Sequence, residues 1–234
     1  MLITLEHSIN ERVAPHMAGL KLPGHLKFLA FAILLANCAT TVALNPKVDR
    51  LPSLPKIPLS VGVYYSPELR SYMYESVHMY ASDNWLPFSL CRGIVLPLGQ
   101  AGATLFERLF PIIFDAAVTI ETRASILPSK PSLIIEPDIE EVQCTRNDKA
   151  THVHITYYIS LYSPSGEALG YWSVTGRGET KERFFEGANS MAAKAAELAM
   201  EDAAGKMAIQ FWNIPAVQRL LKEKGRGPSD IRKT

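Results

Sequence analysis

Strict alternation of apolar and polar side chains over 152–161 constrains the fold of this chain more than any other feature. Apolar residues fill every second position from Val153 to Leu161, with polar residues between them. Successive side chains of a β-strand point to opposite faces, so this period predicts a half-buried strand. The turn Ser163-Pro-Ser-Gly166 then leads into a second strand over 169–178. We expect Trp172 and Val174 of that strand to face the same core.

Other apolar runs predict further strands. They are expected over 59–65, 71–80, 90–96 and 133–143. The second and third of these are interpreted as a hairpin-like excursion. Pro137 interrupts the fourth and predicts a sheet edge or a bulge there. Gly176-Arg-Gly178 is interpreted as a flexible strand end.

Two longer segments have helical spacing. The first, over 100–117, carries one apolar stripe, and Pro111 is expected to kink or break it. The second, over 188–212, has small residues and one methionine on one face: Ala188, Ala192, Ala195, Ala199, Ala203 and Met207. Such a face lets a helix lie close to a sheet. A last short helix is predicted to start at Pro215 and to end near Lys224.

These elements predict an α+β fold with a mixed, mostly antiparallel sheet and helices packed on one face. The predicted domain covers 59–224. The ten residues after it are expected to be disordered. Ahead of it, prolines are frequent over 38–58, which predicts a semi-extended tether.

The apolar run Phe28–Ala36 follows Lys21 and Lys27 and ends close to Cys38. It is shorter than the roughly 20 residues that span a bilayer and has the size of a signal-peptide core. It resembles a bacterial lipoprotein signal, in which the cysteine is lipidated and becomes the first mature residue. Asn37 departs from that pattern, where a small residue is usual. The alternatives are an uncleaved signal anchor or a buried helix.

Residues 1–37 are therefore expected to be a signal peptide. Glu6 and Glu11 are unusual ahead of such a core, and Met17 offers a shorter, basic leader as the true start. The net charge of the chain is +1, and the mature part is close to neutral. No concentrated basic surface is indicated, so nucleic acid is not an expected partner. The lipid on Cys38 is the expected attachment to the membrane.

Two cysteines remain in the mature chain, Cys91 and Cys144. In a compartment that permits disulfides they form either one structural disulfide or two buried thiols. Neither has a close cysteine or histidine, so the pair does not indicate a metal site.

No catalytic motif is present, and no cofactor or metal is expected. His152 and His154 share the polar face of their strand, which more often marks solvent or an interface than a metal site. Glu136, Asp138 and Glu140 alternate in the same way, which indicates exposure more than acid–base chemistry.

Aromatic side chains are concentrated over 64–88. Tyrosine and tryptophan are enriched in protein interfaces, so Tyr72, Tyr74, Tyr80 and Trp85 are candidates for a partner surface. The alternative is that these rings pack the excursion onto the sheet.

The layout resembles that of small outer-membrane lipoproteins of Gram-negative bacteria with a domain like that of the YajG, LpoB and CsgG N-terminal group. The matching parts are Ser60–Pro67, Gly99–Ala117, His152–Gly178 and Ala188–Met207. The resemblance implies a non-enzymatic binding or assembly factor, lipid-anchored at the periplasmic face of the outer membrane, whose partner is an envelope protein. Ala39 after the cysteine resembles the outer-membrane sorting case. A periplasmic hydrolase and a small-ligand or lipid carrier are the alternatives.

Overall fold

The computed structural model of the chain describes residues 40–48, 51–78, 92–122, 131–146, 150–181 and 188–224. The predicted leader, Cys38, Cys91, Tyr80, Trp85 and the tail after 224 lie outside these residues. The described part has a mixed five-stranded sheet and helices, which confirms the α+β class.

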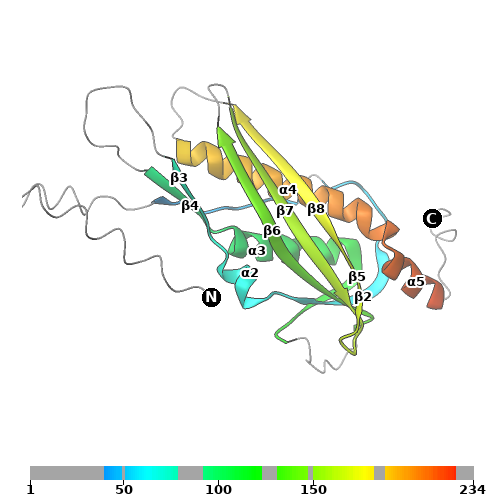
Figure 1. The fold of residues 1–234 in the computed structure, drawn as a ribbon. Coiled ribbons are helices and arrows are strands. Elements are labelled where there is room, and N and C mark those ends of the chain that lie inside the picture. The colour runs from blue at the N-terminus through cyan, green and yellow to red at the C-terminus, as the bar shows by residue number, and fades with distance from the viewer. Residues whose placement is uncertain are drawn as a thin grey trace, which may run out of the picture.

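The main sheet has the strand order β5-β2-β6-β7-β8 (Figure 1). Its members are β2 (Ile57–Tyr64), β5 (Phe114–Ile120), β6 (Leu133–Arg146), β7 (Ala150–Tyr162) and β8 (Ala168–Lys181). β5 and β6 flank β2 as parallel neighbours, whereas β7 and β8 continue the sheet antiparallel. The apolar members of β7 are fully buried, from Val153 to Leu161, so the predicted alternation is confirmed.

Strand β6 changes from a central strand to an edge along its length. β2 pairs with it only over Leu133–Ile135, and beyond this its one paired neighbour among the described strands is β7. Pro137, which has no N–H to donate, lies in the edge part. The register with β7 also shifts between Ile139 and Glu141. Both features predicted from Pro137, an edge and a bulge, are therefore close to it.

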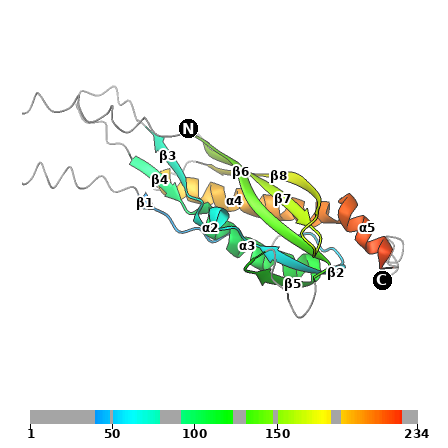
Figure 2. The same cartoon turned by 60° about the horizontal axis from the view of Figure 1, so that its bottom comes forward.

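A second, three-stranded sheet has the order β1-β4-β3. β3 (Tyr74–His78) and β4 (Arg92–Leu96) pair antiparallel, and β1 (Thr40–Thr41) lies parallel to β4. The hairpin-like excursion expected over 70–96 is confirmed for its two strands. This small sheet lies at the opposite end of the molecule from the C-terminal helix α5 (Pro215–Glu223) in both views (Figures 1 and 2).

A short helix, α2 (Pro67–Ser71), stands where the sequence analysis predicted only the end of a strand. The Leu69 N–H donates to the Ser66 hydroxyl oxygen at 3.0 Å. Ser66 is thus an N-cap, and Pro67 suits the first helical turn because its missing N–H is not needed there. The strand predicted over 71–80 accordingly begins at Tyr74.

The longer helices cover one face of the main sheet. α4 (Ala188–Gln210) packs on β7 and β8, and α3 (Leu98–Ile113) packs on β5 and α4. The alanines predicted to face the sheet from Ala192 to Ala203 are buried, as is Met207. A 3₁₀ turn (Phe211–Asn213) joins α4 to α5, which begins at Pro215 as predicted.

The helix predicted over 100–117 is shorter at its C-terminal end than expected. It ends at Ile113, shortly after Pro111, and Phe114–Ala117 belong to β5. Pro111 removes one helical hydrogen bond, and Phe114 pairs instead with Ile57 of β2. The proline therefore marks the end of the helix.

Gly176 and Gly178 are not a flexible strand end, which corrects the sequence interpretation. Both are buried inside β8, where α4 crosses it. A Cβ built on Gly176 would lie 1.9 Å from the Ala199 carbonyl oxygen, and one on Gly178 would lie 1.9 Å from that of Ala195. The two glycines therefore let the helix backbone touch the strand.

The proline-rich stretch before β2 is extended, as predicted, but part of it lies against the domain and does not hang free. The Asn45 N–H donates to the Glu197 carboxylate at 2.9 Å, and the Lys47 N–H donates to the Glu201 carboxylate at 3.2 Å. Val42, Leu44, Val48 and Leu51 pack against the core. We call residues 42–48 and 51–56 the strap.

Candidate functional site

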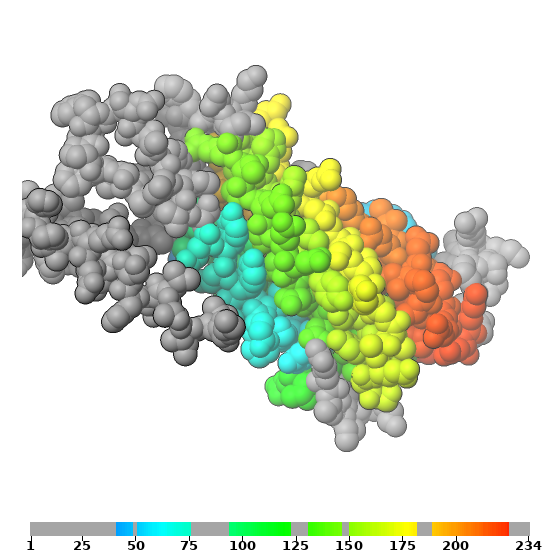
Figure 3. Space-filling view, viewed as in Figure 1, coloured from blue at the N-terminus to red at the C-terminus, as the bar shows by residue number. Residues whose placement is uncertain are grey.

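The outer side of β6, β7 and β8 is an open sheet face. Figure 3 shows these strands toward the viewer with no helix in front of them. The buried positions of β7 face α4, and the positions between them are half-buried on the outer side. The outward side chains of β7 are His152, His154, Thr156, Tyr158, Ser160 and Tyr162. The sheet therefore presents polar and aromatic groups to solvent over three adjacent strands.

Two tyrosines from neighbouring strands form the centre of this face. The Tyr158 and Tyr171 rings lie 5.2 Å apart between centroids, with 30° between their planes. Tyr171 is 71% exposed, a high value for a side chain of this size. Desolvation, followed by the neighbouring Tyr171, Tyr162 and Glu140, raises the pKa of Tyr158. The pair is thus an accessible aromatic platform with a carboxylate beside it.

Carboxylates of β6 line the platform. Asp138 stands opposite Tyr158 in the strand register, and Asp138, Glu140 and Glu141 are exposed. The Ser173 hydroxyl of β8 donates to the Glu140 carboxylate at 2.8 Å, so this side chain reaches across β7. The exposure predicted for the alternating acidic residues is confirmed for Asp138 and Glu140, whereas Glu136 is half-buried.

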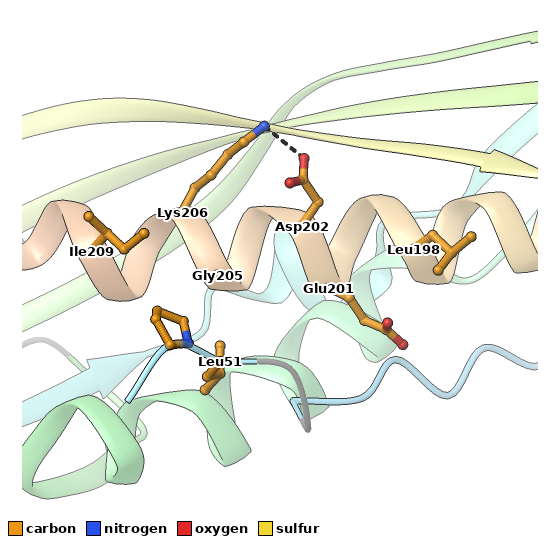
Figure 4. Close-up of a pocket in the computed structure, with 8 residues that line it drawn as sticks. Leu51, Leu198, Glu201, Asp202, Gly205, Lys206 and Ile209 are labelled. Atoms are coloured by element: carbon orange, nitrogen blue, oxygen red, sulfur yellow. Dashed lines mark hydrogen bonds and ion pairs between the residues drawn. The ribbon is translucent and has the colours of Figure 1, made fainter. Parts of the chain in front are cut away.

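The free edge of β8 is closed by α4. The Arg177 N–H donates to Asp202 Oδ2 at 2.8 Å, and Lys206 Nζ donates to the Thr175 carbonyl at 2.8 Å. Lys206 also pairs with Asp202 at 2.7 Å (Figure 4). These side chains occupy backbone groups that an added strand would use. The face of β8 is therefore more accessible to a partner than this part of its edge.

An open groove lies between α4 and the strap (Figure 4). It encloses about 500 Å³, and its lining includes Leu51, Pro52, Leu198, Gly205 and Ile209. Ile209 is 51% exposed, which leaves apolar surface in contact with water. The groove is mainly aliphatic, with the charged groups Glu201, Asp202 and Lys206 along its rim.

The residues singled out from the sequence do not all meet at one place. Tyr72 and Tyr74 are half-buried and pack against the core. Desolvation, followed by the charge of Asp138, raises the pKa of Tyr72. These two rings are therefore neither free nor fully buried, and their role in a partner surface stays a prediction.

Cys144 is half-buried on β6, and desolvation raises the pKa of its thiol. It has no disulfide partner within the described ranges, and Cys91 lies outside them. The choice between a disulfide and two buried thiols stays open.

His152 Nδ1 lies 3.7 Å from a Glu179 carboxylate oxygen on the neighbouring strand. Within the described part of the chain, no group of three or more histidine, cysteine or acidic side chains is placed to hold a metal ion. No helix there is long and apolar enough to cross a bilayer.

Tyr158 and Tyr171 were not selected as site residues from the sequence. The available signal was the alternation of β7 and β8, which puts both tyrosines on outward positions. The aromatic density of 64–88 is the stronger signal in the sequence, because pairing between strands leaves no local pattern.

No protein-family model matches the sequence, and no curated protein is similar enough in sequence to match it. Solved structures with a partly similar arrangement include a DUF330 family protein from Xanthomonas campestris, with a TM-score of 0.45 and 12% identity over 77% of this chain and 98% of that one. A minor lipoprotein from Acinetobacter baumannii has a TM-score of 0.38 and 7% identity, over 67% of this chain and 92% of that one. The uncharacterized lipoprotein B from Nitrosomonas europaea has a TM-score of 0.33 and 12% identity, over 74% of this chain and 92% of that one.

Proposed function

We propose that this chain is a non-enzymatic envelope lipoprotein that binds a partner protein of the periplasmic or outer-membrane machinery. The observation that supports binding is the open sheet face with its exposed Tyr158–Tyr171 pair. Tyrosines offer a large contact area at a low cost in side-chain entropy, and their hydroxyls tolerate water in the unbound state.

The anchor in this proposal is the lipid on Cys38, with the domain at the periplasmic face of the outer membrane. The sequence over 28–38 supports it. Cys38→Ser removes the residue that carries the acyl chains. The domain should therefore stay folded and be released from the membrane fraction by a carbonate wash. A variant that stays with the membrane would contradict a lipid-only anchor.

Site-specific photo-crosslinking tests the binding role. A photoreactive residue in place of Tyr171 should trap a discrete partner in intact cells. The matched control is Ile112 of α3, which is 44% exposed away from the sheet face and should trap none. Absence of a crosslink at Tyr171, or an identical pattern at both positions, would contradict a partner on this face.

The aromatic segment 64–88 is proposed as a second part of the contact. Replacing Tyr72, Tyr74 and Tyr80 with serine should abolish partner recovery while thermal stability falls little. Because Tyr72 and Tyr74 pack against the core, unfolding of the triple variant would assign them to packing instead.

A carrier of small apolar ligands is the second candidate, and the groove between α4 and the strap favours it. Gly205→Leu would place an aliphatic side chain at the groove lining. A carrier should then lose binding of a fluorescent fatty acid, whereas a partner-binding protein should keep its crosslink at Tyr171. The hydrolase alternative predicts turnover of wall or lipid substrates by the purified chain, which we expect to be undetectable.

A further inference from the structure

We infer that the open sheet face binds a cationic segment of the partner protein, with an arginine stacked on the Tyr158–Tyr171 pair and facing the carboxylates of β6. This inference rests on the proposed function, because it specifies the chemistry of the partner at the same face. Three observations support it: the geometry of the Tyr158–Tyr171 rings, the position of the β6 carboxylates and the distribution of charge along the strands.

The ring pair offers the geometry that a guanidinium group needs. The two centroids are 5.2 Å apart, the planes are 30° from parallel, and Tyr171 is 71% exposed. An aromatic ring attracts a cation over its face, and arginine does this well because its guanidinium is planar and weakly hydrated. A partner arginine can therefore stack here without displacing core residues.

The carboxylates come from β6, and that of Glu140 reaches across β7 to β8. Glu140 is held by the hydrogen bond from Ser173, and Asp138 lies opposite Tyr158. The irregular register between Ile139 and Glu141 lets two consecutive acidic residues, Glu140 and Glu141, project near the face while both remain exposed. Carboxylate oxygens accept paired N–H bonds from the same guanidinium that stacks on a ring.

The part of the sheet face around the Tyr158–Tyr171 pair carries acidic side chains. The strand segments 133–143, 154–162 and 168–175 contain Glu136, Asp138, Glu140 and Glu141, and they contain no lysine or arginine. The lysines and arginines of these three strands lie outside these segments, at Arg146, Arg177 and Lys181. Like charges across an interface are costly, so an acidic partner surface is disfavoured and a basic one complements this field.

Fluorescence anisotropy of labelled peptides tests the inference directly. The probe is an octapeptide of alternating arginine and serine, added to the full chain in nonionic detergent, with a glutamate–serine octapeptide as the opposite-charge probe. The arginine probe should bind, and the glutamate probe should not. Tyr171→Ser should weaken the arginine probe about fivefold, and Glu140→Gln about threefold, the sizes expected for one exposed cation–π contact and one exposed ion pair.

Glu107→Gln is the matched control, since Glu107 is exposed on α3 and the variant changes net charge by the same amount as Glu140→Gln. It should leave the affinity unchanged. Equal weakening by Glu107→Gln and Glu140→Gln, or no weakening by Tyr171→Ser, would overturn the inference as bulk electrostatics. Far-ultraviolet circular dichroism would verify that each variant is folded.

The outcomes separate this inference from the proposed function. A crosslink at Tyr171 in cells together with probe binding that ignores Tyr171 and Glu140 would keep a partner on the face and reject its cationic character. Probe binding that depends on both residues, with no crosslink in cells, would keep the chemistry of the face and reject the proposed partner role.

Discussion

Gly176→Ala tests how closely α4 and β8 approach each other. The added Cβ would lie 1.9 Å from the Ala199 carbonyl oxygen and 2.8 Å from the Ala203 Cβ. Real Cβ contacts essentially never fall below 3.0 Å. The helix and strand would therefore have to separate by about 1 Å, the difference between 3.0 and 1.9 Å.

The neighbouring atoms cannot move aside easily. The blocking oxygen belongs to the helix backbone, and it is fixed by the hydrogen bonds of α4. A gap of 0.5–1 Å, as a rough guide, already loses a quarter to a half of a van der Waals contact, and overpacking costs about 1–3 kcal/mol or more. Because α4 packs along β8 and β7, we expect Gly176→Ala to lower the free energy of unfolding by about 3 kcal/mol.

Urea unfolding followed by circular dichroism would measure this loss, and the melting temperature should fall by roughly 6–12 °C. The control is Gly205→Ala, since a Cβ on Gly205 of α4 meets nothing within 4 Å. It should stabilise the chain by about 0.5–1 kcal/mol, the usual gain in a helix interior. If Gly176→Ala were neutral or stabilising, α4 could not lie on β8 as closely as described.

Further predictions concern three side chains, of which Tyr157 is buried and Trp172 and Cys144 are half-buried. Trp172→Ala should cost about 3 kcal/mol in urea unfolding, because its ring packs 4.8 Å from Phe211; a loss below about 1 kcal/mol would contradict that packing. The Tyr157 hydroxyl is buried with no hydrogen-bond partner in the described part, so Tyr157→Phe should stabilise by about 1 kcal/mol. Burial also raises the pKa of Tyr157 above its ordinary value of 10.0. The folded state then keeps a proton that the unfolded state loses, so stability should fall as pH rises above about 10, and less steeply in Tyr157→Phe. Cys144 should react with a thiol reagent more slowly in the native than in the urea-unfolded chain, because desolvation raises its pKa; equal rates would contradict its burial.

Much of the fold was predictable because its signals are local. The alternation of β7, the alanine face of α4 and the proline at the start of α5 each fix an element from a few adjacent residues. The errors occurred where a distant contact decides the structure. Phe114 leaves the helix because β2 offers it a parallel partner. Gly176 was interpreted as flexible because its contact with Ala199 of α4 joins residues far apart in the sequence.

The candidate site was less predictable than the fold. The sequence placed Tyr158 on the polar side of its strand, yet the pairing that brings Tyr171 within 5.2 Å of it depends on the register of β7 against β8. Likewise, Glu140 meets Ser173 only because β6 and β8 flank the same strand. These are contacts between strands, and the periodicity within a single strand does not predict them.

The sequence by itself determined which faces of the long strands and helices are apolar, the turn over 163–166, and the α+β class that these periods imply. The tertiary structure decided which faces are covered. It lays α4 over one side of β7 and β8, leaves their other side without a covering helix among the described residues, and holds the strap against the domain through Glu197 and Glu201. The physical reason is that burial depends on contacts between segments far apart in the chain, whereas periodicity depends only on the geometry of a single segment.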